Sequence, residues 1–174
     1  MHKRALYLPL TALFLLASID AHAIPTFTNW ATVDASADSA SGTLNGIGVS
    51  LTGYDIFAGS VTDGTSLRFS DATCFTPALA QSDFVAITGS FATTFTYTVT
   101  FSSPVMNPIM HVASLASILR FPGITLTKVN GETNFVVSGS DVIGGLNDYY
   151  PTCGNNDRNG TILLNGTFTS FTFT

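Results

Sequence analysis

The strongest constraint on the fold of this chain is a strict alternation of polar and apolar residues between Thr94 and Phe101. The apolar members of this stretch are Phe95, Tyr97, Val99 and Phe101. Successive side chains of a β-strand point to opposite faces, so the alternation predicts a strand with one buried face and one exposed threonine face. Half-buried strands of this kind are typical of antiparallel sheets.

Shorter apolar runs, separated by turn residues, extend this pattern along the chain. They predict further strands at residues 27–33, 42–52, 66–70, 84–88, 109–115, 124–129, 134–138 and 161–174. Turns are expected at residues 63–64, 104, 122–123, 130–131 and 144–145, and Asn165-Gly166 predicts a hairpin turn. Residues 76–82 are expected to form a short helix or a long loop, and residues 139–160 the longest irregular segment. The predicted fold is all-β, a two-sheet antiparallel β-sandwich of jelly-roll or Greek-key type.

The N-terminus has the composition of a secretory signal peptide. Lys3 and Arg4 precede an apolar run of residues 5–17, and Ala21-His22-Ala23 has the small-residue pattern of a cleavage site. The run is shorter than the roughly twenty residues that a bilayer span needs. We therefore expect a signal peptide of residues 1–23, an exported protein that is secreted or held at the cell surface, and no membrane span in the mature chain. A buried N-terminal helix is the alternative.

Cleavage after residue 23 of the 174 leaves 151 residues, a length typical of one domain, here residues 24–174. This part carries four Lys and Arg residues against ten Asp and Glu residues, a net charge of −6, which makes nucleic acid and anionic lipid poor partners. Its many aromatic and β-branched residues argue against disorder.

Two cysteines, Cys74 and Cys153, are predicted to form a disulfide, because an even count in an exported chain favours pairing. The bridge would join residues 79 positions apart and stabilise the fold by up to roughly 4.5 kcal/mol through the entropy of the unfolded chain. Two unpaired buried thiols are the alternative.

The disulfide is tested by mass spectrometry of the purified protein without reductant. We expect a mass two hydrogens below that of the reduced chain, and no reaction with a thiol reagent. A mass that corresponds to two free thiols would contradict the bridge.

Catalysis has little support in the sequence. His111 is the one histidine of the mature chain, and its neighbours place it on a strand face with Ile109 and Ala113, which we expect to be the inner face. No nucleophile elbow and no zinc-binding H-E-x-x-H motif is present, so a hydrogen-bonded structural histidine is the favoured interpretation. A pair of aspartates could still hydrolyse glycosides, but most of the aspartates stand in turn-like contexts.

Residues 147–160 concentrate oxygen-bearing side chains and two tyrosines. Asp148, Asn155 and Asp157 are candidate calcium ligands, although the EF-hand pattern is incomplete and no cofactor is otherwise expected. Tyr149 and Tyr150, with Asn155 and Asn156, are candidate carbohydrate ligands, because aromatic rings cover the apolar faces of sugars. A solvated loop tied down by Cys153 is the alternative to both.

Two further patterns have alternative interpretations. Trp30, the only tryptophan, is expected in the core, with a sugar-binding role as the alternative. Asn159-Gly160-Thr161 and Asn165-Gly166-Thr167 match the N-glycosylation acceptor, which is used only in a host with that machinery.

Three segments together resemble a known group of bacterial proteins. They are Asn29-Trp30, the run from Phe101 to Val112, and the closing stretch from Gly160 to Phe171. In style and spacing they are similar to exosortase-sorted, choice-of-anchor surface or secreted proteins. The resemblance implies an extracellular β-sandwich. Members of this group commonly end in a Pro-Glu-Pro signal with an apolar helix, whereas the sequence given stops at Thr174, so we expect free release or an anchor outside this sequence.

The sequence thus predicts an extracellular, non-enzymatic module with a structural, matrix or adhesive role, capable of self-association through sheet edges. The alternative is a carbohydrate-binding module, or a weak glycan-active enzyme, that uses the 147–160 loop.

Overall fold

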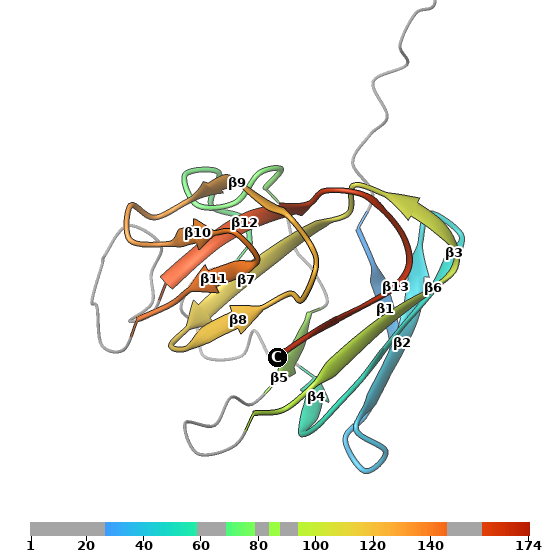
Figure 1. Cartoon of the computed structure of the whole chain (residues 1–174). Helices are drawn as coiled ribbons and strands as arrows, with labels where there is room; N and C mark the ends of the chain where they lie inside the picture. The colour runs from blue at the N-terminus through green and yellow to red at the C-terminus, as the bar shows by residue number, and fades with distance from the viewer. Residues whose placement is uncertain (1–26, 59–68, 79–83, 88–93, 146–157) are drawn as a thin grey trace, which may run out of the picture.

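The computed structural model describes residues 27–58, 69–78, 84–87, 94–145 and 158–174 (Figure 1). Within these ranges the regular structure consists of antiparallel strands without a helix, which confirms the all-β class. The strands form two sandwich-like layers with apolar side chains between them.

One layer is a five-stranded sheet in the order β1-β2-β3-β6-β13. Its strands are β1 (Asn29–Asp34), β2 (Ser39–Leu44), β3 (Ile47–Thr52), β6 (Tyr97–Met106) and β13 (Thr167–Phe173). The predicted strand around Thr94–Phe101 is the start of β6, and Tyr97 and Phe101 are buried as expected.

The opposite layer is built from two three-stranded sheets, β7-β12-β9 and β10-β11-β8. Their strands are β7 (Ile109–Leu115), β8 (Ile118–Arg120), β9 (Leu126–Gly131), β10 (Val136–Ser138), β11 (Asp141–Ile143) and β12 (Arg158–Leu164). A short pair, β4 (Ile56–Ala58) and β5 (Val85–Ile87), lies at one end of the molecule in Figure 1.

The prediction of one strand over residues 42–52 is wrong, because the chain reverses at Asn45-Gly46. Leu44 pairs with Ile47, and the φ angles of Asn45 and Gly46 are 49° and 81°. Two positive φ angles in a two-residue loop match the strand twist of a hairpin, and Asn-Gly is the dipeptide that adopts them most readily. The sequence therefore contained the signal for this turn.

The prediction of a hairpin at Asn165-Gly166 is also wrong. β12 and β13, on either side of it, belong to different layers, so this dipeptide forms a corner at which the chain crosses from one layer to the other. The chain makes a second crossing at Asn107, between β6 and β7. Asn107 and Gly166 join the two corners, because each backbone N–H donates to the other residue: Asn107 N to Gly166 O (2.6 Å) and Gly166 N to Asn107 Oδ1 (2.9 Å). We call residues 106–108 with 164–167 the double crossing.

Pro104 does not end a strand, contrary to the predicted turn, but lies inside β6. Pairing of β6 with β3 ends at Phe101, and the register with β13 is irregular between Thr100 and Val105. A proline lacks the N–H that a sheet ladder needs, so this interrupted stretch of β6 is where the sheet tolerates one.

Smaller predictions also differ from the structure. Residues 69–70 form a turn rather than the end of a strand, and Asn130-Gly131 ends β9. Residues 76–78 are not helical, in agreement with the long-loop alternative, and residues 79–82 lie outside the described residues. The strands β4, β8 and β11, each of three residues, were not predicted, because alternation over three residues is too short to recognise.

Stacked aromatic rings join the two layers at the end of the molecule opposite the double crossing. The ring of Phe173 stacks on Tyr97 and on Phe121, with centroids 5.2 and 5.3 Å apart. Phe121 follows β8, and the backbone of Arg120 exchanges two hydrogen bonds with Thr174 (2.8 and 3.0 Å). The layers are therefore fastened at two places, the double crossing and this aromatic stack.

The stack gives a stability prediction. Phe173 is 1% exposed, so Phe173→Ala should lower the free energy of unfolding by about 3–5 kcal/mol, through lost burial and the cavity left behind. The matched control is Thr172→Val, on the exposed face of the same strand, for which we expect a change within about 0.5 kcal/mol. Urea unfolding of the three proteins measures both, and equal values for the two variants would contradict the stack.

Candidate functional site

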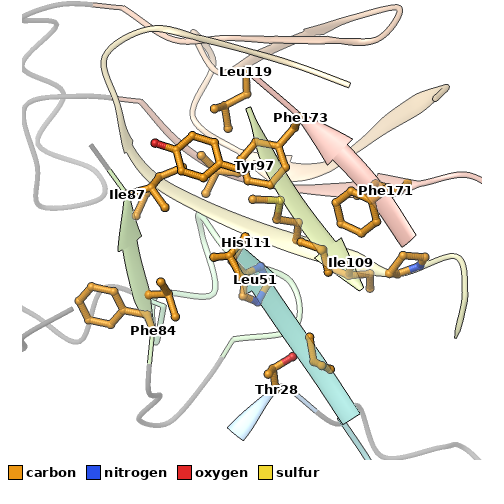
Figure 2. Close-up of a pocket in the computed structure, with 18 of the residues that line it drawn as sticks. Thr28, Leu51, Phe84, Ile87, Tyr97, Ile109, His111, Leu119, Phe171 and Phe173 are labelled. Carbon is orange, nitrogen blue, oxygen red and sulfur yellow. The ribbon is translucent and has the colours of Figure 1, made fainter. Parts of the chain in front are cut away.

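A pocket of about 990 Å³, partly open to solvent, lies between the layers and extends to residues 69–78 beside β7 (Figure 2). We call this pocket the cavity. Side chains of both layers line it, among them Leu51, Val99 and Phe101 on one side and Met110, Val112 and Leu119 on the other. The lining also includes residues at both fastening points, Asn107 at the double crossing and Phe173 in the aromatic stack. The cavity therefore occupies the space between the two places that hold the layers together.

The lining is predominantly apolar and nearly uncharged. Among the described lining residues, the only formally charged side chain at neutral pH is that of Arg120. Its Nε and one terminal nitrogen donate to both carboxylate oxygens of Asp141 on the neighbouring strand (2.9 and 3.1 Å). Hydrogen bonds from Arg120 lower the pKa of the Asp141 carboxyl, and the same pairing raises the pKa of Arg120. The one cation at the cavity is thus already neutralised.

The pocket is partly open to solvent and is not a sealed void. Its walls are mainly apolar, so an apolar molecule bound there would remove apolar surface from water. Buried water, in contrast, is held where several polar partners surround it.

Two aromatic residues that line the cavity, Trp30 and Tyr97, report on its environment. Trp30, on β1, packs against the core and lines the cavity, but it is only half-buried, so the expectation that it lies in the core is met in part. Burial raises the pKa of the Tyr97 hydroxyl, and the carboxylates of Asp55 and Asp38 raise it further. Tyr97 therefore stays uncharged across the physiological pH range.

His111 does share a strand face with Ala113, but this is not the face of β7 that joins the main core. Val112 points into that core, whereas Ala113 packs against a second small cluster formed by Cys74 and Phe75. Residues 69–78 cover the His111 face, so the expectation that His111 lies on the inner face is wrong. The left-handed backbone of Ser114 (φ 55°) then shifts the alternation and returns Leu115 to the main core.

Both ring nitrogens of His111 have hydrogen-bond partners. Nδ1 lies 2.9 Å from Thr161 Oγ1, and Nε2 lies 3.0 Å from the carbonyl oxygen of Pro77. The N–H of Thr76 donates to the same Thr161 hydroxyl (3.1 Å). Because a carbonyl can only accept, Nε2 carries the proton, and the hydroxyl of Thr161 donates to Nδ1. Burial lowers the pKa of His111, so the imidazole is neutral at physiological pH. The hydrogen bonding that the sequence interpretation expected of His111 is therefore present.

The remaining predicted site residues lie outside the described residues. These are Asp148, Tyr149, Tyr150, Cys153, Asn155, Asn156 and Asp157. Cys74 is 2% exposed beside Phe75, but its pairing with Cys153 stays a prediction. Within the described ranges, no group of three or more His, Cys, Asp or Glu side chains is arranged to hold a metal ion, and the calcium hypothesis for the 147–160 loop is untested.

A buried polar network joins β7, β9 and β12. Asn159, 1% exposed, accepts a hydrogen bond from the Ser114 N–H through Oδ1 and donates its own N–H to Glu132 Oε2 (3.0 and 2.8 Å). These bonds hold the irregular stretch of β12 against its neighbours.

The burial of Asn159 also makes the first glycosylation sequon inaccessible in the folded protein, whereas Asn165 in the second is exposed.

One aromatic platform lies on the surface. Tyr54 is 50% exposed, and its ring stacks on Phe95 with centroids 4.1 Å apart and an interplanar angle of 11°. Asp55 follows Tyr54 in sequence and is also exposed. We call Tyr54 and Phe95 the aromatic platform.

Comparison with known proteins adds no relative from which a function could be transferred. No protein-family model, curated protein or solved structure significantly matches this chain. Among the residues that the structure describes, none belongs to a helix long and apolar enough to cross a bilayer. The assignment of the site therefore rests on its geometry.

The sequence predictions missed the cavity and the platform. Some apolar residues that line the cavity, such as Tyr97, Val99 and Phe101, were predicted to lie on the buried face of a strand, but their sequence pattern is the same whether two layers touch or stand apart. Tyr54 lies between strands, where no periodic pattern identifies it.

Proposed function

We propose that this chain is an exported, non-enzymatic surface or matrix module that acts by binding, and that its ligand site is the cavity between the layers. The ligand is an uncharged apolar molecule. The observation that carries this proposal is a cavity of about 990 Å³ whose described lining offers no unpaired charged side chain. Ligand pockets of roughly 300–1,000 Å³ with mostly apolar walls are typical of small-molecule sites.

Charge selectivity follows from the cost of desolvation. A charged ligand group enters an apolar site favourably only if it meets an opposite charge or several hydrogen bonds. Arg120 is already paired with Asp141, and His111 is neutral with both nitrogens engaged. A neutral molecule avoids this cost, so the lining favours it over a carboxylate or an amine.

We also propose three features that the sequence predicted. They are a signal peptide of residues 1–23, a relation to exosortase-sorted proteins, and a jelly-roll or Greek-key connection of the strands. The two crossings between layers at Asn107 and Asn165 support a sandwich connectivity of that kind. Self-association would use β1, an edge strand of the five-stranded sheet.

The cavity is tested with N-phenyl-1-naphthylamine, an uncharged fluorophore, added to the purified protein. We expect saturable binding, reported by energy transfer from Trp30, the only tryptophan. Val99→Phe places a ring into the cavity and should weaken binding at least about tenfold, equivalent to about 1.4 kcal/mol. The sulfonated analogue 1-anilinonaphthalene-8-sulfonate should bind at least about tenfold more weakly than the neutral probe, because the site offers no unpaired cation.

The matched control is Thr100→Phe, which adds the same ring to the exposed face of the same strand. This variant should bind the neutral probe as the wild type does. The free energy of unfolding of Val99→Phe gives a second measure. A ring forced into a closed core would lower it by about 1–3 kcal/mol, whereas an open cavity accepts the ring with a smaller loss. No saturable binding, or equal weakening by both variants, would contradict the cavity as a ligand site.

A second candidate function is adhesion through glycan contact at the aromatic platform. The half-exposed Tyr54 ring, held flat on Phe95, is the kind of surface that covers the apolar face of a sugar, and the exposed Asp55 carboxylate beside it can accept hydrogen bonds from hydroxyls. This candidate is independent of the 147–160 loop, whose tyrosines remain the alternative platform.

A glycan array distinguishes the two surfaces. If the platform binds glycans, Tyr54→Ala should abolish the signal, Tyr54→Phe should keep most of it, and the double change of Tyr149 and Tyr150 to Ala should leave it unchanged. The reverse pattern would assign binding to the loop, and an array without signal would contradict glycan adhesion.

A further inference from the structure

We propose that His111 is a pH-sensitive latch that holds residues 69–78 against β7 and β12, and that acid widens the opening of the pocket by releasing them. The inference rests on the proposed function, because it assigns regulation to the same cavity. Phe69 and Pro77 of this segment, together with His111 itself, belong to the cavity lining. Release of the segment would therefore remove part of the wall.

The segment is docked by the buried side chains of Cys74 and Phe75 and by polar contacts that converge near His111. The Thr76 N–H donates to Thr161 Oγ1, and Pro77 O accepts from His111 Nε2 (3.1 and 3.0 Å). On β9, Asn130 Nδ2 donates to Thr76 Oγ1 (2.8 Å). Two phenyl rings of the segment, Phe69 and Phe75, pack on the imidazole at 5.6 and 5.4 Å between centroids.

These contacts fit only the neutral imidazole. Thr161 is fully buried, and its hydroxyl accepts from Thr76 while it donates to His111 Nδ1. A proton added to Nδ1 would point at that hydroxyl, whose own hydrogen would then lose its acceptor in a buried place. An unsatisfied buried donor is unfavourable, and so is a charge without a partner.

No charged group of the described elements around His111 compensates that charge. The one acid among residues 69–78 is Asp71, whose Oδ1 accepts hydrogen bonds from Thr73. On β12 the one charged residue is Arg158, which contacts Ile143 O and would repel a cation; β7 and residues 27–28 carry no carboxylate. Phenyl rings attract a cation weakly. Burial nonetheless dominates and lowers the pKa of His111.

The direction of the effect follows from linkage. In the docked state the pKa of His111 lies below its ordinary value of about 6.5, and in the released state the exposed ring regains that value. The released state therefore binds the proton more tightly. Docking is strongest above about pH 6.5 and weakens as the pH falls through this value toward the lower pKa of the docked state.

The test combines two readouts at pH 7.5 and pH 5.0. The first is amide hydrogen exchange of residues 69–78, corrected for the intrinsic pH dependence of exchange, which reports docking without any ligand. The second is the dissociation rate of N-phenyl-1-naphthylamine. In the wild type we expect both rates to rise at least about fivefold at pH 5.0. His111→Gln offers an acceptor and a donor without a titratable proton, and should flatten both pH dependences.

If His111→Gln does not fold, measurements on the wild type alone still test the latch. The midpoint of the rise in exchange should coincide with the titration of the His111 Cε1–H resonance in the nuclear magnetic resonance spectrum. Exchange that does not change with pH would overturn the latch. Exchange that responds to pH while the probe dissociates equally at both pH values would overturn the coupling to the cavity. A probe that binds at neither pH would locate the failure in the proposed function, because exchange still reports the latch.

Discussion

The double crossing is the constraint on which the rest of the structure depends. The chain passes between the layers at Asn107 and again at Asn165-Gly166, and two backbone donors join the corners. Asn165 Nδ2 also donates to Thr125 O, just before β9, and to Thr127 Oγ1 within that strand (2.9 and 3.0 Å), so the corners are fixed to a third segment. This arrangement sets the separation of the layers at one end. At the other end, the stack of Phe173 on Tyr97 and Phe121 does the same.

Between these two fixed ends the layers stand apart around the cavity of about 990 Å³, which is partly open to solvent. Densely packed interiors leave few voids, so a space of this size lies where the two layers do not pack directly on each other. The polar network of Glu132 and Asn159 and the hydrogen bonds of His111 lie in the layer with the smaller sheets, and of these three residues only His111 lines the cavity. Polar interactions therefore stiffen one wall, while the space itself stays apolar.

The sequence predicted the class of fold better than its connections. Strand 109–115 has the predicted bounds, and Tyr97 and Phe101 are buried as their alternation requires, because period-two patterning is a local property. The hairpin at Asn165-Gly166 was wrong, because the same dipeptide can reverse a chain within a sheet or carry it to another layer. Pro104 was misjudged for a similar reason, since only the pairing of neighbouring strands shows where a donor is dispensable. The cavity depends on the distance between layers, which no local pattern encodes.

The central claim is that the layers hold an apolar ligand between them, and nuclear Overhauser contacts from a bound ligand test it most directly. Leu51 lies on β3 of one layer and Val112 on β7 of the other, and both line the cavity. With N-phenyl-1-naphthylamine bound, we expect its ring protons to show contacts to the methyl groups of both residues. Contacts to surface residues alone, or direct Leu51–Val112 methyl contacts that persist in the presence of the ligand, would contradict the claim.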